Sequence, residues 1–349
     1  MSLEEELKAI RHSCALSQMD HAVYLRISGD GAYEAADRIF PTTLRLRDAQ
    51  IMLTLLLEED GRPLADIQLG REDDNFLLVA EGRSPQDLIE VVRDRLPPGV
   101  QVDIDDIGAE HDVLALSGPY AWEVMSALVG PEIVGMPYGT IFHVRGWTCF
   151  RAGKTGEYGY ELFIPKQDTA AVRAEILELG ARFELREASL AALDLCALEN
   201  WFFNVRREGS ENLTPLELQL QWRISYQKDY VGAEALKRRR AQGIKRRLTC
   251  LVGDGPIHAG MELRYRGHAV GHIVNAEFST LRQEWVAQGL VDTRVSRPGI
   301  TGFAAGPSLS GPALRTFLPP VINNRSLYVN PQRHSFRTRS EVTFPELLS

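Results

Sequence analysis

The order of the predicted elements, which occurs twice in the first part of the chain, constrains the fold more than any other feature. A strand at 22–28 leads through a glycine turn into a helix at 33–40, and hairpin strands and a helix at 85–96 follow. A second strand at 113–116 meets Ser117-Gly118-Pro119, and proline suits the first turn of a helix. Because the strands are grouped between helices instead of alternating singly with them, the pattern predicts an α+β fold and not a doubly wound parallel sheet.

Further runs complete these two similar subdomains, and turns rich in charged residues or glycine separate several of them. The expected strands lie at 51–57, 64–69, 76–79, 142–151 and 158–164, and the expected helices at 170–179 and 188–201. We therefore expect one α+β region that spans residues 1–245.

The character of the sequence changes from about residue 247. Short strands are expected at 248–252, 262–265, 269–275 and 284–291, with glycine-containing turns between several of them. Such a series predicts a small antiparallel β domain or barrel. The residues after about 300 are rich in Gly, Pro, Ser and Asn, and we expect them to form a wrapping tail with little regular structure. The barrel domain and its tail would then occupy 246–349.

Composition excludes several classes of protein. The net charge of −8 argues against bulk binding to nucleic acid, which normally requires a basic excess. The four cysteines include no CxxC pair, and free thiols fit a cytoplasmic protein. We find no signal peptide and no run of the ~18 apolar residues that a membrane span needs. His268 and His272 lie on an expected strand, where this spacing separates side chains by ~13 Å, so we expect no metal site.

The segment from Lys154 to Leu162, KTGEYGYEL, carries the most informative pattern. Two glycines bracket a tight turn, and the chain then enters a strand that places Tyr160 on one face and Glu161 on the other. A half-exposed strand would leave Glu161 in solvent. If that face is buried, the carboxylate needs partners, and a ligand with paired N–H donors would supply them.

The same segment resembles the TGE-x-G-[FY]-E motif of the folate-binding aminomethyltransferase family, which includes the T-protein of glycine cleavage. Other segments resemble further motifs of that family in the same order. These are LRISGDGAYEAADRIF, LTLLLEEDGRPLADIQL, DVLALSGPYAWEVM, ALDLCALENWFFNVRREGSENLTPLE, QKDYVGAEAL and GHAVGHIVNAEFS. The resemblance implies the family's multidomain fold with a C-terminal antiparallel β-barrel, and a central channel that binds tetrahydrofolate.

The resemblance also implies roles for single residues. Glu161 matches the glutamate that holds the pterin edge. The other residues expected to bind the cofactor are Tyr160, Glu199 and Trp201, the last on the substrate side. The family's acidic pair aligns with Ala65 and Asp66. The first aspartate, to which aminomethyl transfer is attributed, is therefore absent, and Asp66 is the expected catalytic residue.

Other departures from the family make the expected pocket more apolar. A family tyrosine aligns with Leu53, an asparagine with Ala80, and two arginines with Leu193 and Ala197. A methyl group on oxygen, sulfur or nitrogen does not necessarily need the lost carboxylate, because its transfer to folate N5 is a displacement helped chiefly by alignment in a dry site. Folate-dependent demethylases of this fold also lack the first aspartate. We therefore expect a tetrahydrofolate-dependent one-carbon transferase of the demethylase type, which acts on a small-molecule C1 donor or acceptor.

Two alternatives stay open. One is a folate-binding or assembly protein without transferase activity, and the other is an enzyme that reuses the channel for a different ligand. The iron–sulfur assembly branch of the superfamily carries a cysteine motif that residues 227–234 lack, which disfavours that branch. The sequence predicts neither the C1 donor nor the oligomeric state.

Overall fold

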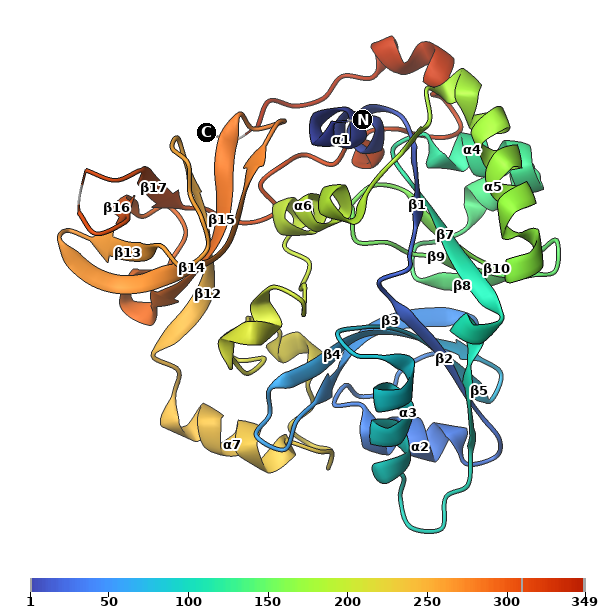
Figure 1. Cartoon of the computed structure of the whole chain (residues 1–349), viewed down its shortest axis with the longest axis horizontal. Helices are drawn as coiled ribbons and strands as arrows, with labels where there is room; N and C mark the ends of the chain where they lie inside the picture. The colour runs from blue at the N-terminus through green and yellow to red at the C-terminus, as the bar shows by residue number, and fades with distance from the viewer. Residues whose placement is uncertain (1, 309, 348–349) are drawn as a thin grey trace.

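Two units with the same order of elements, β-α-β-β-β-α-β, occupy residues 23–187 of the chain in this computed structural model, which describes residues 2–308 and 310–347 (Figure 1). They follow helix α1 (Leu3–His12) and strand β1 (Ala15–Gln18). The first unit consists of β2 (Val23–Ser28), α2 (Ala32–Ile39), β3 (Gln50–Leu57), β4 (Pro63–Glu72), β5 (Asn75–Glu81), α3 (Pro85–Asp94) and β6 (Asp103–Asp106). The second consists of β7 (His111–Ser117), α4 (Ala121–Val129), β8 (Thr140–Val144), β9 (Trp147–Arg151), β10 (Gly159–Pro165), α5 (Lys166–Gly180) and β11 (Arg186–Glu187). The predicted α+β class is confirmed.

One sheet joins both units, in the strand order β11-β1-β7-β10-β9-β8-β3-β4-β5-β2-β6. In the first unit α2 and α3 pack on one face of the sheet through helix residues such as Leu88. In the second unit α4 and α5 pack on the sheet through helix residues such as Met125. The opposite faces share a third cluster that includes Val79, Phe150 and Phe163. Because every second residue of a strand faces the same side, Glu81, two residues after Val79, and Glu161, two residues before Phe163, also turn toward the space between the two halves.

Helices α6 (Leu190–Asn200) and α7 (Ala233–Gln242) connect the sheet to a closed antiparallel barrel. Its strands are β12 (Arg246–Gly253), β13 (Glu262–Tyr265), β14 (His268–Ser279), β15 (Glu284–Asp292), β16 (Thr301–Ala305) and β17 (Ala313–Thr316). They follow the order β12-β15-β14-β13-β16-β17, and Leu251, Ile273 and Phe303 lie in the apolar core of the barrel. The predicted C-terminal antiparallel β-barrel is confirmed.

Short 3-10 helices occupy many of the connections. They are η1 (Ile107–Ala109), η2 (Pro131–Gly135), η3 (Ala181–Phe183), η4 (Glu208–Glu211), η5 (Gln221–Arg223), η6 (Thr293–Val295), η7 (Arg325–Leu327) and η8 (Phe336–Glu341). Local capping fixes where several α-helices begin. Ser84 accepts a hydrogen bond from the Asp87 backbone N–H ahead of α3, with proline in the first turn, and Ser189 caps α6 in the same way.

The structure corrects two expectations about the elements. The single strand expected at 142–151 is a hairpin, because Arg145 and Gly146 both adopt a positive φ and turn the chain between β8 and β9. Residues 301–305 and 313–316, expected in an irregular tail, form β16 and β17, which close the barrel. The rest of the tail to residue 347 contains only 3-10 turns, while residues 309, 348 and 349 lie outside the described residues.

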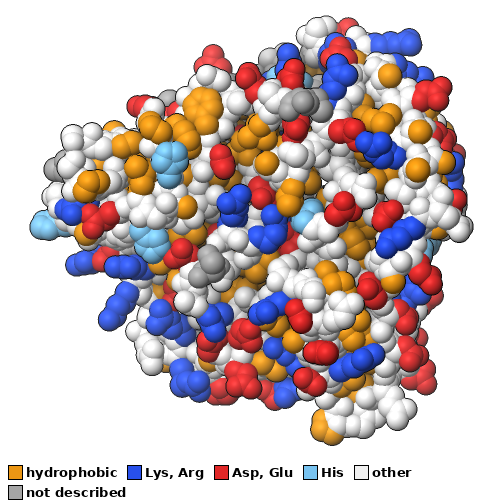
Figure 2. All heavy atoms as spheres, viewed as in Figure 1, with side chains coloured by type: hydrophobic (Ala, Val, Ile, Leu, Met, Phe, Trp, Pro, Cys, Tyr) orange, Lys and Arg blue, Asp and Glu red, His pale blue; other side chains and the backbone are white. Residues whose placement is uncertain are grey.

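Charged side chains of both signs are interspersed over the face seen in Figure 2, so the negative charge does not gather there in one patch. Within residues 2–308 and 310–347, no helix has both the length and the apolar composition needed to cross a bilayer.

Candidate functional site

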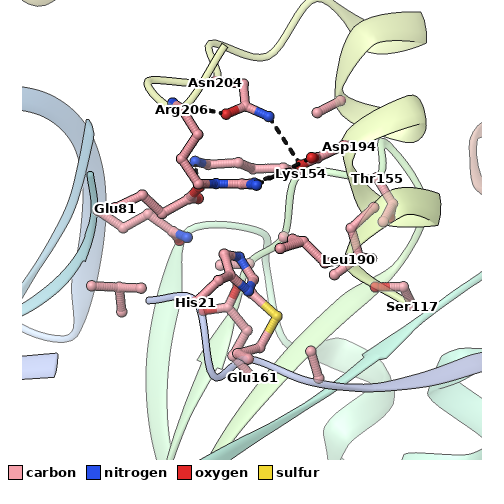
Figure 3. A pocket seen from close by; sticks show the side chains of 18 of the residues that line it. His21, Glu81, Ser117, Lys154, Thr155, Glu161, Leu190, Asp194, Asn204 and Arg206 are labelled. Atoms are coloured by element: carbon pink, nitrogen blue, oxygen red, sulfur yellow. Dashed lines mark hydrogen bonds and ion pairs between the residues drawn. The ribbon is translucent and has the colours of Figure 1, made fainter. Parts of the chain in front are cut away.

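A cavity lies between the two halves of the sheet, and the empty space in it and at its open mouth amounts to about 600 Å³ (Figure 3). Strands β4, β5, β7 and β10 and the loop between β9 and β10 contribute to its wall, together with α6 and the loop after that helix. Small side chains such as Ala115 and Ala197 leave this space open. The cavity therefore lies where both units meet the segment that leads to the barrel.

Glu161 on β10 faces this cavity, whereas Leu162 packs on the other face of the strand beneath α4 and α5. Glu161 is only 2% exposed, and its Oε2 atom has no hydrogen-bond partner among the described residues. Burial raises the pKa of Glu161 to about 7, although the Gln68 side chain and the charge of Lys154 oppose this rise. A buried carboxylate with a free oxygen is suited to accept hydrogen bonds from a ligand.

A cluster of charged residues forms the neighbouring wall. Asp66 on β4 and Glu81 on β5 are direct partners in the antiparallel register, so their carboxylates repel one another unless a cation lies between them. Lys154 supplies this cation, because its Nζ donates to Asp66 Oδ2 at 2.7 Å and to Glu81 Oε1 at 2.5 Å. Arg223 Nη1 also donates to Asp66 Oδ1 at 2.5 Å. Two cations therefore hold the buried Asp66.

Arg206 extends this cluster to helix α6. Its Nε donates to Glu81 Oε2 at 3.3 Å, and its Nη2 donates to Asp194 Oδ1 at 2.5 Å. Burial raises the pKa of Glu81, but Lys154, His21 and Arg206 outweigh burial and hold this pKa at about 2. Glu161 lies apart from this paired cluster (Figure 3).

Position 65 faces away from the cavity. Ala65 is fully buried in the apolar cluster beneath α2 and α3, whereas its neighbour Asp66 points to the opposite face. A carboxylate at position 65 would therefore enter an apolar core in this chain. The alanine removes no carboxylate from this cavity. Leu193 and Ala197 line it, as expected for a more apolar pocket, but its wall also carries paired charges.

Three of the expected cofactor-binding residues lie outside the lining of this cavity. Tyr160 is 1% exposed beneath α4, on the face of β10 opposite Glu161, because adjacent strand residues alternate. Glu199 on α6 accepts hydrogen bonds from Arg11 Nη2 and Ser279 Oγ, each at 2.6 Å. It therefore belongs to a buried network between α1, α6 and the barrel.

Trp201 is the third of these residues. It ends α6 with a left-handed φ of 61° and packs against the apolar clusters on either side of that helix. The chain then turns so that Phe203, two residues later, lines the cavity. Asp66 also lies behind the lining and reaches the cavity through its ion pair with Lys154. The structure therefore brings Glu161 and Lys154 into the cavity, with Asp66 directly behind them.

Sequence reasoning did not identify Lys154, Glu81, Arg206 or Asp194 as site residues. Two signals were available. Lys154 begins the same segment that ends near Glu161, and Glu81 is a charged residue at the end of an apolar strand. The role of these residues depends on which side chains meet in the folded sheet, and the sequence pattern does not show these contacts.

A second cleft lies beside the first, with about 900 Å³ of space. Leu53, Tyr138, Phe202 and Leu327 give it a largely apolar wall. Gly153, in the loop between β9 and β10, lines both the cavity and this cleft. The loop that carries Lys154 thus borders both of them.

The family model described as the GCVT N-terminal domain matches residues 1–228. The chain belongs to this family. An aminomethyltransferase of Thermoanaerobacter pseudethanolicus is 25% identical to this GCVT-family chain, over 85% of the chain and 83% of that relative. The aminomethyltransferase of Halothermothrix orenii is 26% identical, over 85% of both proteins.

A solved structure described as glycine cleavage system aminomethyltransferase T from Bartonella henselae has the same fold as this GCVT-family protein. Its TM-score is 0.83 at 23% identity, and the match covers 93% of this chain and 90% of the other. The predicted family resemblance and T-protein-like fold are confirmed. The comparisons also agree with the expected class of enzyme, a folate-dependent one-carbon transferase.

We expect Glu161→Gln to raise the free energy of unfolding by about 3 kcal/mol at pH 8. The folded-state pKa of about 7 lies above the ordinary 4.5, so the cost of ionising the buried carboxyl grows as the pH rises between these values. Glutamine keeps the shape of the side chain and avoids this cost. Urea unfolding at pH 8 and pH 4.5 measures the effect, which should vanish at the lower pH. The same gain at both pH values would contradict this origin.

Proposed function

We propose that this protein is a tetrahydrofolate-dependent one-carbon transferase of the demethylase type, which takes a methyl group from a small molecule. The observation that carries the proposal is the buried Glu161 carboxylate, which faces the cavity with one oxygen unpartnered among the described residues. Family membership supports the same class of reaction. Tetrahydrofolate supplies N5 as the acceptor of the methyl group.

The residues present fit a pterin at Glu161. A pterin edge offers adjacent N–H donors, and two parallel hydrogen bonds to one carboxylate give both strength and orientation. Glu161 has an oxygen available for such a donor. The apolar cleft with Leu53 and Phe202 adjoins this cavity at Gly153, and it offers room for the aromatic linker of folate. Glu161 would thus orient the cofactor, and the cleft would exclude water beside it.

The paired charges favour a methyl donor without a free ammonium group. Lys154, Arg206 and Arg223 engage the carboxylates of Asp66, Glu81 and Asp194. A cationic amine would have to displace one of these cations, which is costly in a buried site. A neutral ether, sulfide or amine needs no such exchange. In this proposal Asp66 does not contact the donor but orients Lys154.

The same pairing favours a second candidate, a folate-binding protein without transfer activity. Asp66, the expected catalytic residue, is held by Lys154 and Arg223 and is only 2% exposed, so it offers no free base. Such a protein would bind tetrahydrofolate through Glu161 and turn over no methyl donor.

Titration of the purified protein with tetrahydrofolate, by calorimetry or tryptophan fluorescence, tests the proposal beside Glu161→Ala. We expect saturable binding by the wild type and loss of that binding in the variant. Methyl donors are then screened for formation of 5-methyltetrahydrofolate, which separates the two candidates. Absence of binding by the wild type would sink both and turn the search to another ligand for the cavity.

A further inference from the structure

The polar tail segment 323–328 lies against the loop between β9 and β10, which carries Lys154. Figure 1 shows the tail leaving the barrel and passing α1 toward α4 and α5. Ser326 and Leu327 line the apolar cleft, and they come from the part of the tail that touches the loop. This tail segment therefore forms part of the wall of the apolar cleft, and it also contacts the loop that borders both the cleft and the cavity.

Glu157, three residues after Lys154, receives most of these contacts. Its carboxylate accepts hydrogen bonds from the Ser326 backbone N–H at 2.8 Å, from Ser326 Oγ at 2.7 Å and from the Arg325 backbone N–H at 3.2 Å. Ser326 Oγ in turn accepts a hydrogen bond from the Tyr158 backbone N–H at 2.8 Å. One hydroxyl thus bonds to two consecutive residues of the loop.

The other end of the loop is held from two directions. Buried Arg11 on α1 donates from Nη1 to the Thr155 carbonyl at 2.5 Å and to Asn324 Oδ1 at 3.2 Å. At Gly156, with φ of +77°, an added Cβ would lie 2.5 Å from Asn324 Oδ1 and 2.3 Å from Asn200 Oδ1. Glycine is favoured here by its positive φ, and the side chains of Asn324 from the tail and Asn200 from α6 leave little space for a Cβ.

We propose that Ser326 and Asn324 are positioning residues, which hold the loop so that Lys154 stays between Asp66 and Glu81. The loop contains Gly153 and Gly156, which give its backbone wide conformational freedom. Without the contacts to the tail, the loop would therefore be free to change its shape. The Lys154 ion pairs depend on distances of 2.5 and 2.7 Å, which a small shift of the loop would lengthen. The segment for which the sequence suggested no role thereby shapes the binding site from outside.

The test compares Ser326→Ala with Ser326→Thr, which keeps the hydroxyl. Asn323→Ala is the matched control, because the Asn323 side chain bonds to the backbone of Pro345 and Glu346 and not to the loop. The first readout is hydrogen exchange of peptide 152–159 in the free protein, which needs no ligand. The second is the Kd for tetrahydrofolate, which rests on the proposed function. For Ser326→Ala we expect exchange at least tenfold faster and binding about tenfold weaker, with the values for Ser326→Thr and Asn323→Ala near those of the wild type.

The outcomes separate the two proposals. Faster exchange of peptide 152–159 only in Ser326→Ala supports the positioning role, even if the wild type does not bind tetrahydrofolate. Unchanged exchange in Ser326→Ala overturns the positioning role and leaves the proposed function intact if the wild type binds. Equal acceleration in Ser326→Ala and Asn323→Ala also overturns it, because the effect would then be a general loosening of the tail.

Discussion

Replacing Lys154 by methionine is expected to lower the free energy of unfolding by about 3–5 kcal/mol at pH 7. The change removes the cation between Asp66 and Glu81, whose side chains are 1% and 9% exposed. Arg223 and Arg206 each still contact one of these carboxylates, but direct partners across two strands then repel one another in a buried sheet. Urea denaturation with linear extrapolation measures the loss.

The loss should also depend on pH. With a folded-state pKa of about 2, below the ordinary 4.5, Glu81 contributes stability that is complete above pH 4.5 and is lost as the pH falls toward 2. Without Lys154 the pKa of Glu81 rises, so in the variant Glu81 is protonated at a higher pH, which relieves its repulsion with Asp66. The free energies of unfolding of wild type and variant should therefore become more similar as the pH falls from 7 to 4. Lys166→Met, at an exposed position at the start of α5, is the control and should change stability by less than about 0.5 kcal/mol. A loss for Lys154→Met that is equal at pH 7 and pH 4 would contradict the ion-pair account.

Features that depend on local alternation were predictable from the sequence. The face of Glu161 follows from its place between Tyr160 and Leu162, since adjacent strand residues point in opposite directions. The repeated order of strands and helices follows in the same way from apolar periodicity and turns. These signals lie within a few residues of one another, so they can be interpreted without knowing which distant parts of the chain are in contact.

Features that depend on remote partners were not predictable. β16 and β17 are only five and four residues long, and they become strands because β13 and β12 pair with them. Such short segments among glycines and serines carry little strand signal of their own. For this reason the tail was expected to have little regular structure.

The charged cluster shows the same limit within the site. Asp66, Glu81, Lys154, Arg206 and Arg223 come from five separate parts of the sequence, and only the folded chain brings them together. The family resemblance singled out the alanine at position 65 as the main change in the site, yet its side chain faces the apolar core and not the cavity. The distinctive chemistry of this site is therefore the neutralised carboxylates, which the aligned motif did not reveal.

Tetrahydrofolate binding by the wild type is expected to strengthen about 25-fold between pH 5.5 and pH 7.5. The pKa of Glu161 is about 7, so the fraction of charged carboxylate rises steeply over this range. Paired N–H donors of a pterin need an acceptor at both oxygens, and protonation converts one of them to a donor. Glu161→Gln should weaken binding about a hundredfold at pH 7.5, because two charge-assisted hydrogen bonds are lost. Calorimetric titration at several pH values measures both effects.

The decisive comparison is the shape of the pH profile. Glu161→Gln should bind weakly with no slope between pH 5.5 and pH 7.5, because the group that titrates has been removed. Glu123→Gln is the control, since burial also raises the pKa of Glu123, but this residue lies on α4 and bonds to the Phe336 backbone N–H. It should keep the wild-type slope. A wild type that binds equally well across the range, or a Glu161→Gln protein with the wild-type slope, would show that another group controls binding.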